Sequence, residues 1–341
     1  MADIDIRQLS GAFSFFLPIK LYQPEQDLRR LTQINLRSLE RFFDRELLEK
    51  VVIAARAKDV PLIQDAVSKS GISLPVEVIP ETKLLPNLAR LGGMGWFRQQ
   101  VLKIFAWRVI DSPYVILLDD DVLMTRPTGR DELVMGGRLV MSHLHADGFR
   151  QYFDSSCPLL GYDRDAVSPE QRVMNVTPEV MVTAELRNLV GELRQLWNLR
   201  SDDAVCEFLL RVSKDYCLPQ PTDLWGRLWR KARARLFPAS DAVWRQRRDV
   251  FMHWTEYTLY WVYLLKVERT GHYYDYNADE HARQLNDEGI WFEDQARQLG
   301  IDDWLERTFC VGHQHCFAVY SARVESLDRE ELYTKLQDRL W

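Results

Sequence analysis

Short apolar runs and longer stretches of three- and four-residue periodicity alternate along the first third of the chain. The apolar runs predict strands, and the periodic stretches predict helices. The predicted strands are Phe13–Leu17, Val51–Ala55 and Val76–Ile79, and the predicted helices between them are Asp27–Leu47 and Pro61–Ser68. This β-α-β-α-β order favours an α/β fold with a mostly parallel central sheet, right-handed crossovers and flanking helices.

The next segment combines a glycine-rich loop, a helix and a strand. The loop Gly92–Gly95 opens into a helix predicted over Trp96–Ile110. The polar face of this helix carries Trp96, Gln99, Gln100, Lys103 and Trp107. We expect the opposite, apolar face to pack on the sheet. The strand Tyr114–Leu118 that follows is apolar on both faces, as a central strand of a parallel sheet is.

Beyond about residue 140 the pattern is less regular and mainly helical. It predicts helices over Val180–Trp197, Trp254–Val267 and Arg329–Leu340, and a late strand over Phe317–Tyr320. We therefore divide the chain into residues 1–145, an α/β half, and residues 146–341, a mainly helical half of the same domain.

Three consecutive aspartates, Asp119, Asp120 and Asp121, follow the strand Tyr114–Leu118 directly. Adjacent carboxylates repel one another, and a divalent cation removes that penalty. Mg²⁺ and Mn²⁺ prefer carboxylate and phosphate oxygens, and open α/β sheets bind ligands beyond the carboxyl ends of their strands. The aspartates therefore predict a cation and phosphate site. The alternative is a turn whose aspartates cap the next element.

The string from Tyr114 through the aspartates to Leu123 resembles the apolar strand and D-x-D motif of GT-A glycosyltransferases, whose fold has a Rossmann-like, mostly parallel sheet. The longer string that starts at Gly95 resembles an uncharacterised bacterial group of that superfamily, and the resemblance covers about residues 10–145. It implies transfer of a sugar from a nucleotide-sugar, by default a UDP-sugar, to an acceptor hydroxyl in bacterial glycan or glycolipid synthesis. The C-terminal half would then bind the acceptor.

The resemblance also implies roles for individual residues. Asp119 and Asp121 match the outer aspartates, which in GT-A enzymes meet the metal, Mn²⁺ or Mg²⁺, and the donor diphosphate. Asp120 holds the variable middle place, and we count Asp119 and Asp120 among the donor contacts. The cation would act as a Lewis acid on the leaving nucleoside diphosphate.

The loop that ends at Gly95 and the polar helix face after it are further candidates for donor contact. We expect Trp96 to stack on a base or a sugar, Gln100 to lie on the same face, and Lys103 to reach a phosphate. An ordinary amphipathic helix with a solvated lysine is the alternative.

Many GT-A enzymes complete the metal site with a histidine just before a late strand. His313 and His315 stand at that place in this chain, and both point the same way if the segment is extended. Either could be a third metal ligand. A structural zinc site with Cys310 and Cys316 is the alternative, although these cysteines lack the usual close spacing.

Thr255-Glu256 resembles the short acidic motif that supplies the general base in many inverting GT-A enzymes, with Tyr257 in place of the usual second aspartate. The predicted helix N-terminus favours the ionised carboxylate that a base requires. Glu256 is therefore the candidate base of an inverting transfer. The alternative is simple charge complementarity at the first turn of a helix, and a retaining enzyme would need no such base.

The 341-residue chain has a formal net charge of −6, which gives no global field for nucleic acid. Within it, residues 224–248 are basic and contain Trp225 and Trp229 on one side of a predicted amphipathic helix. This segment could contact an anionic membrane that presents a lipid-linked acceptor, bind an acidic polysaccharide, or cover the domain with a solvated basic face. No nucleic-acid-binding motif accompanies the charge.

The start of the chain has no signal-sequence pattern, no window is apolar enough to span a bilayer, and its five cysteines form no C-x-x-C pair. We therefore expect a cytoplasmic protein with free thiols, peripheral to the inner face of the membrane if residues 224–248 bind there. A sugar nucleotidyltransferase is a rival function, but such enzymes have a glycine-rich loop after the first strand, and residues 13–23 contain no glycine. A non-catalytic carbohydrate-binding or scaffold protein of the same fold is another, although it has little use for clustered aspartates.

Overall fold

The computed structural model of the chain describes residues 8–88, 95–141, 144–174, 177–212, 253–274, 285, 289–310, 315–321, 324 and 328–341. Five strands form its central sheet, in the order β10-β4-β1-β2-β3. Four of them are parallel, namely β1 (Phe13–Ile19), β2 (Leu48–Ala55), β3 (Val76–Pro80) and β4 (Tyr114–Leu117). The apolar sequence of β1 matches its place, because β2 and β4 flank it and every one of its residues is buried. The predicted α/β fold with a mostly parallel sheet is confirmed.

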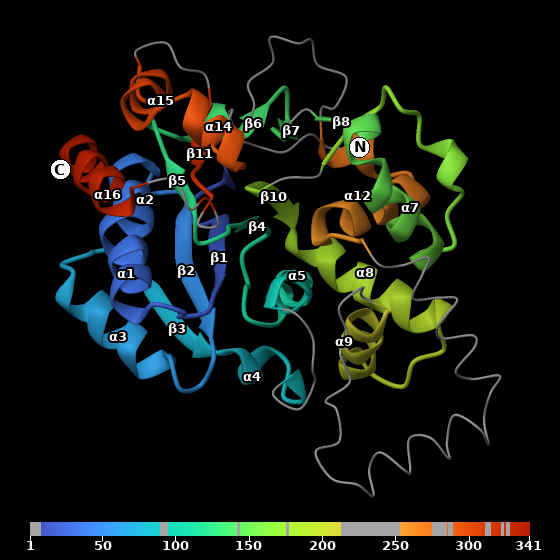
Figure 1. Ribbon diagram of the computed structural model, residues 1–341. Helices are drawn as coiled ribbons and strands as arrows, with labels where there is room; N and C mark the ends of the chain where they lie inside the picture. Colours follow the sequence, from blue (N-terminus) through green and yellow to red (C-terminus); the bar gives the residue numbers. More distant parts are fainter. Residues whose placement is uncertain are drawn as a thin grey trace, which may run out of the picture.

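The crossovers place helices on both faces of the sheet, as Figure 1 shows. The β1–β2 connection is a continuous helical stretch of α1 (Pro24–Arg29), the π-helical η2 (Arg30–Asn35) and α2 (Leu36–Phe42). On the same side lies α3 (Val60–Lys69), and α5 (Gly95–Ile104) lies on the other. The helical stretch begins at Pro24, before the predicted start at Asp27. It ends at Phe42, before the predicted end at Leu47, because the chain turns there to enter β2.

The fifth strand, β10 (Glu179–Val182), corrects the prediction of a helix over Val180–Trp197. β10 runs antiparallel to β4, with Glu179 opposite Leu117 and Val182 opposite Tyr114, and the helix α8 (Thr183–Leu196) begins only after it. All four strand residues are buried. A buried apolar run this short has no periodicity that separates a strand from the first turn of a helix, so pairing with β4 decides its structure.

Helices from the second half of the chain cover the polar face of α5. The helix α12 (Glu256–Lys266) begins at Thr255, whose Oγ1 accepts a hydrogen bond from the Thr258 N–H at 3.1 Å, as the sequence predicts for an aromatic helix from about Trp254. α12 contacts α5, α7 (Arg150–Leu159) and α8, and α9 (Asp202–Arg211), which was not predicted, also contacts α5. Because α5 is covered in this way, its Gln100 and Lys103 are only 5% and 2% exposed.

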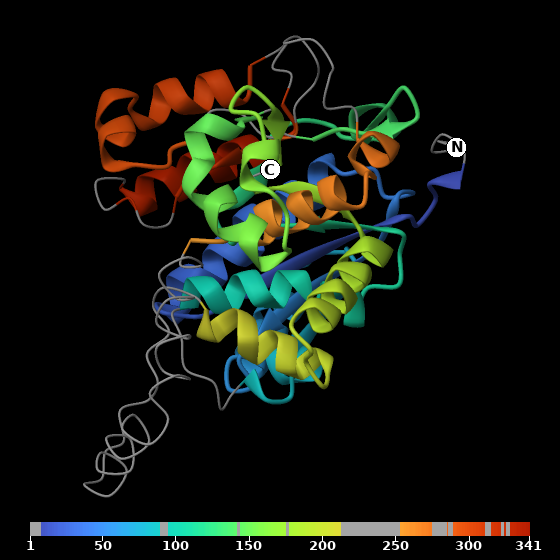
Figure 2. The same ribbon diagram turned by 90° about the vertical axis from the view of Figure 1, so that its right-hand side faces the viewer.

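A two-stranded ribbon extends the fold beyond the central sheet. In it β5 (Val122–Met124) runs antiparallel to β11 (Phe317–Val319), with Val122 opposite Val319. Together with α15 (Ile301–Thr308) and α16 (Arg329–Leu340), the ribbon builds a second, smaller apolar core. The predicted late strand and terminal helix are confirmed. In the view of Figure 2 these C-terminal helices lie at one end of the molecule, and α8 and α9 lie at the other.

The remaining elements are short. They are α4 (Glu81–Leu84), η4 (Ala106–Arg108), α6 (Arg130–Leu133), β6 (Val134–Met135), β7 (Arg138–Leu139), β8 (Leu144–His145), η5 (Ala146–Phe149), η6 (Arg164–Ala166), β9 (Arg172–Val173), α13 (Thr270–Tyr273) and α14 (Glu293–Gln298). The helix predicted over Trp96–Ile110 is therefore interrupted after Ile104 and continues as the single 3₁₀ turn η4.

None of the helices in the described part of the chain has both the length and the apolarity that a bilayer crossing requires.

Glu185 on α8 ties three helical segments together. Its side chain is 2% exposed, accepts hydrogen bonds from the hydroxyls of Tyr263 (2.9 Å) and Tyr273 (2.8 Å) and from Nδ2 of Asn188 (3.1 Å), and pairs with Arg269. Burial raises the pKa of Glu185, but these donors outweigh it, and the pKa lies below its usual value. The ionised carboxylate therefore stabilises the fold at neutral pH.

We expect Glu185→Gln to lower the free energy of unfolding at neutral pH by about 2–3 kcal/mol, since hydrogen bonds to a charged group are lost. The pKa of Glu185 in the folded state lies below its unfolded value of about 4.3. Its stabilisation is therefore present above that value and is lost as the pH falls through the folded pKa. The variant should consequently lose less stability than the wild type over that acidic range.

Urea unfolding at a series of pH values measures this effect. Glu192→Gln is the matched control, because Glu192 lies on the same helix but is 26% exposed and pairs with Lys266 near the surface. That substitution should cost less than about 1 kcal/mol. Equal losses in the two variants would contradict the role of Glu185.

Candidate active site at the carboxyl end of the central strand

The three aspartates form a tight turn between β4 and β5. The turn is held by hydrogen bonds on both sides: the N–H of Asp119 donates to Oγ1 of Thr177 at 3.3 Å, and the N–H of Tyr320 donates to the carbonyl of Asp121 at 3.0 Å. All three aspartate side chains are partly exposed. The predicted carboxylate cluster thus lies at the carboxyl end of a buried strand, where open α/β sheets bind ligands.

The side chain of Lys103, on α5, forms an ion pair with Asp119, the first of the three aspartates. Its Nζ lies 2.7 Å from Oδ1 of Asp119, 2.8 Å from Oε1 of Glu256 and 3.1 Å from the hydroxyl of Tyr257. The ammonium group thus donates hydrogen bonds to Asp119 and Tyr257 and forms an ion pair with Glu256. Asp119, Lys103 and Glu256 were predicted from separate parts of the sequence, and the structure brings them together.

The electrostatics of this cluster keep the lysine charged. Burial lowers the pKa of Lys103, but the carboxylates of Asp119 and Glu256 raise it by more, and the pKa lies well above its usual value. Burial also raises the pKa of Glu256, against the opposing effect of Lys103. Lys103 therefore supplies a permanent positive charge behind Asp119.

This geometry changes the interpretation of two predicted residues. Lys103, expected to reach a phosphate, is 2% exposed, and its ammonium group is enclosed by Asp119, Glu256 and Tyr257. Glu256, expected to act as a general base, has 0% exposed surface. A general base must come within hydrogen-bond reach of the proton that it takes, and Glu256 instead faces Lys103.

Asp120 is held from the other side of the sheet by residues that the sequence analysis did not single out. Its carboxylate pairs with Arg30, which is 5% exposed and also donates to Oδ1 of Asp27 at 3.1 Å. Burial lowers the pKa of Arg30, but Asp120 above all raises it, so that the guanidinium stays charged. Asn35 donates from Nδ2 to the carbonyls of Asp120 (3.1 Å) and Val122 (2.6 Å).

These supporting residues lie on a π-helical segment, since Arg30 and Asn35 begin and end η2. π-Helical turns are frequent at functional sites. The signal in the sequence was the presence of Asp27, Arg30 and Asn35 among the apolar residues of a helix that follows the first strand. Without the fold, nothing indicated that Arg30 faces the aspartates.

The predicted donor-contact residues at the start of α5 lie beside the loop that follows β1. Gly95 and Trp96 are partly exposed, and a Cβ on Gly95 would come within 3.0 Å of the Tyr22 hydroxyl. Asp27 holds this loop, because its Oδ2 accepts from the N–H groups of Tyr22 (2.7 Å) and Gln23 (2.8 Å). The Tyr22 side chain is 69% exposed and was missed by the sequence analysis. Gln100 is buried one turn further along α5.

His315 does not join the aspartates. Thr125 donates from its Oγ1 to the carbonyl of His315 at 3.1 Å, whereas Tyr320, five residues further on, is hydrogen-bonded to Asp121. In an extended ribbon five residues span roughly 16 Å, so His315 lies at the opposite end of the ribbon from Asp121. His313 lies outside the described residues, as do Gly92–Met94 and the basic segment 224–248.

The aspartates fit a divalent cation of the magnesium type. Among the residues that the structure describes, no three His, Cys, Asp or Glu side chains are grouped to hold a metal ion. Such a trio is not required, because Mg²⁺ commonly binds one or two carboxylates and completes its shell with water and substrate phosphate. Asp119 and Asp121, both partly exposed at the same turn, provide that donor set.

No curated protein matches the chain in sequence. In structure it is similar to apo mouse xyloside xylosyltransferase 1 (12% identity, 92% of this chain and 98% of that chain, TM-score 0.43). It is similar as well to the galactosyltransferase LgtC in complex with donor and acceptor sugar analogues (10% identity, 95% of each chain, TM-score 0.43). A third similar structure is glucosyl-3-phosphoglycerate synthase from Mycobacterium tuberculosis with Mn²⁺, UDP and glucosyl-3-phosphoglycerate (14% identity, 53% of this chain and 62% of that chain, TM-score 0.31). Similarities this low assign no activity to the chain.

One protein-family model matches nearly the whole sequence, over residues 11–338. The match includes the central sheet, the aspartate turn with its supporting residues Arg30 and Lys103, and the ribbon that closes the turn. The chain therefore belongs to DUF6492, a family of unknown function.

Proposed function

We propose that this chain is a glycosyltransferase that uses a divalent cation, Mn²⁺ or Mg²⁺, to transfer a sugar from a nucleotide-sugar to an acceptor hydroxyl. The observation that carries the proposal is the aspartate turn beyond β4. Two of its three carboxylates form ion pairs with buried cations from different elements, Lys103 and Arg30. A fold that buries two cations to maintain a partly exposed acidic turn supports a function for that turn beyond capping a helix.

Each residue of the turn has a separate part in this proposal. Asp119 and Asp121 would hold the cation, which would supply Lewis-acid stabilisation to the leaving diphosphate. Asp120 pairs with Arg30 and anchors the turn. Lys103 orients the Asp119 carboxylate through Oδ1, and 30% of the Asp119 side chain stays exposed for a ligand.

We place the donor between the aspartate turn and the start of α5. Trp96 and Tyr22 offer partly or largely exposed aromatic rings there, and stacking on a base or a sugar suits both. At Gly95 the start of α5 lies close to the Tyr22 hydroxyl, since a Cβ there would come within 3.0 Å of it. A UDP-sugar is the default donor.

Proton transfer from the acceptor is not assigned to Glu256. Because its carboxylate is buried against Lys103, we propose a positioning role for Glu256. It balances the charge of the lysine, and the ion pair connects α12 to α5. We further propose a glycan or lipid-linked acceptor, contact of residues 224–248 with an anionic membrane, and a cytoplasmic location.

We expect the purified protein to release UDP slowly from at least one UDP-sugar in the presence of Mn²⁺, because water can replace the acceptor. Removing the cation with EDTA should slow this release at least about tenfold, given the size of typical Lewis-acid effects. The measurement is UDP release across a panel of nucleotide-sugars. Exchange of pyrophosphate instead would identify a sugar nucleotidyltransferase, and binding without either reaction would identify a carbohydrate-binding protein.

A further inference from the structure

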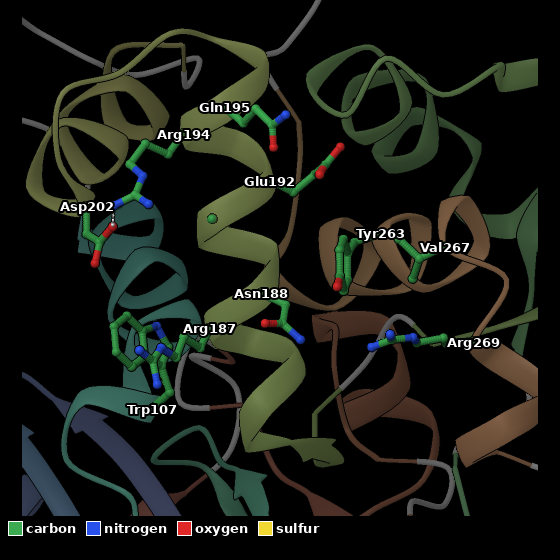
Figure 3. A pocket seen from close by; sticks show the side chains of 11 residues that line it. Trp107, Arg187, Asn188, Glu192, Arg194, Gln195, Asp202, Tyr263, Val267 and Arg269 are labelled. Atoms are coloured by element: carbon green, nitrogen blue, oxygen red, sulfur yellow. Dashed lines mark hydrogen bonds and ion pairs between the residues drawn. The ribbon is translucent and has the colours of Figure 1, made fainter. Parts of the chain in front are cut away.

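A cavity of about 680 Å³ lies over α8, remote from the aspartate turn (Figure 3). α8 begins after Val182, which pairs with Tyr114 at the amino end of β4, whereas Asp119 follows the carboxyl end of that strand. The cavity and the aspartates therefore lie at opposite ends of the central sheet. Its volume falls within the range of about 300–1,000 Å³ that is typical of small-molecule sites.

The floor of the cavity is one face of α8, and two walls rise beside it. Figure 3 shows Trp107 and Asp202 on one side and Tyr263 and Arg269 on the other, with Asn188 on the helix between them. Polar and aromatic side chains thus line a pocket that is open to solvent, since Arg187, Asn188 and Gln195 are exposed.

Most of the charged groups around the cavity are paired within the protein. Arg194 pairs with Asp202 at 3.3 Å. Glu192 pairs with Lys266 at 2.6 Å, and Arg269 pairs with the buried Glu185. These pairs balance one another and leave no net charge on the walls.

Arg187 is the exception. Its guanidinium lies 5.7 Å from the ring centroid of Trp107, and among the described residues it has no carboxylate within ion-pair distance. Because the neighbouring charges are balanced, Arg187 gives the cavity a net positive charge. A planar guanidinium with free N–H groups is suited to a carboxylate or a phosphate.

The cavity also offers both kinds of neutral hydrogen-bonding group. Asn188 donates its Nδ2 to Glu185, so its amide oxygen is left as an acceptor, and Gln195 provides a further amide. Sugar hydroxyls both donate and accept, and this mixed lining can satisfy them.

A glycine in the middle of α8 lines the cavity, and its lack of a side chain leaves space there. A Cβ built on this residue, Gly191, would meet no atom within 4 Å. Glycine is disfavoured inside a helix, and here the packing around it does not require one. A side chain at this position would project into the cavity.

From these features we propose that the cavity binds a saccharide that carries a carboxylate or a phosphate. Arg187 would bind the anionic group, and the amides of Asn188 and Gln195 would bind hydroxyls. The proposal concerns a second site and does not depend on the activity proposed for the aspartate turn.

Calorimetric titration of the full chain with glucuronic acid, glucose 6-phosphate and neutral glucose tests this proposal. We expect at least one of the two acids to bind at least about tenfold more tightly than glucose, and Arg187→Gln to remove that preference. Gly191→Leu should weaken binding of the acids, because the leucine side chain would project into the cavity and occupy part of it. It should not unfold the protein, since leucine is a better helix former than glycine.

Arg41→Gln is the matched control, because it removes one exposed positive charge from α2, on the other face of the sheet. Neither it nor the two cavity variants should change the affinity for UDP in Mn²⁺. The proposal is overturned if neither acid binds more tightly than glucose, or if Gly191→Leu binds the acids as the wild type does while thermal unfolding shows that it is folded.

Discussion

The chain carrying Asp121→Asn is expected to lose cation-dependent UDP release by about 10³-fold, or about 4 kcal/mol of transition-state stabilisation. Asn keeps the shape of the side chain but removes the charge that would hold the cation. Because the turn itself is held through the Asp121 carbonyl and the Tyr320 N–H, which the substitution retains, the protein should stay folded. UDP affinity should fall in Mn²⁺ and stay unchanged in EDTA.

The matched control is Asp111→Asn. Asp111 lies before the amino end of β4, its side chain is 89% exposed, and its loss removes the same charge from the same part of the sequence. Initial rates, calorimetric UDP affinity with and without Mn²⁺, and thermal unfolding of both variants complete the comparison. The cation proposal would be excluded if Asp121→Asn kept the wild-type rate, or if the wild-type rate were the same in chelator.

Lys103→Met is expected to cost about 3–5 kcal/mol of unfolding free energy, because it leaves the buried Glu256 without its cation. The double variant Lys103→Met/Glu256→Gln should recover most of that loss, since no uncompensated charge then remains in the interior. It should nevertheless bind UDP weakly in Mn²⁺, because Asp119 has lost the group that orients it. This combination separates the stabilising role of Lys103 from its positioning role.

Urea unfolding and calorimetry measure the two effects separately. Lys69→Met is the control for loss of an ion pair as such: Lys69 and Asp65 lie 2.7 Å apart, but their side chains are 74% and 59% exposed. That loss should stay below about 1 kcal/mol. If the double variant bound UDP and Mn²⁺ like the wild type, Lys103 would serve the fold alone.

The parallel strands and the aspartate turn could be predicted because their signals are local. Runs such as Tyr114–Leu117 are apolar on both faces, and three adjacent carboxylates at the end of such a run need an explanation whatever the rest of the fold. β10 could not be predicted, because its four buried residues become a strand only by pairing with β4. The sequence therefore predicted the α/β order of the first half but not the fifth strand.

The supporting residues of the site depend on contacts between distant segments. Lys103 meets Glu256 across 153 positions, and Arg30 meets Asp120 across 90, so no spacing in the sequence indicates either pair. His315 illustrates the opposite case. Its residue type and order suited a metal ligand, but the register of β5 and β11 moves it to the far end of the ribbon.

The ribbon of β5 and β11 also determines when the site can form during synthesis. The aspartate turn is closed by the N–H of Tyr320, and α16 packs against η2, the segment that carries Arg30. Residues 13–117 contain the four parallel strands and can begin to pair long before that part of the chain leaves the ribosome. A nascent chain can therefore build its sheet early, yet its acidic turn gains the last of its supports only after Tyr320 and α16 have been made. Loss of the segment from Tyr320 through α16, by premature termination or proteolysis, would leave the parallel sheet but remove the contacts that shape the turn.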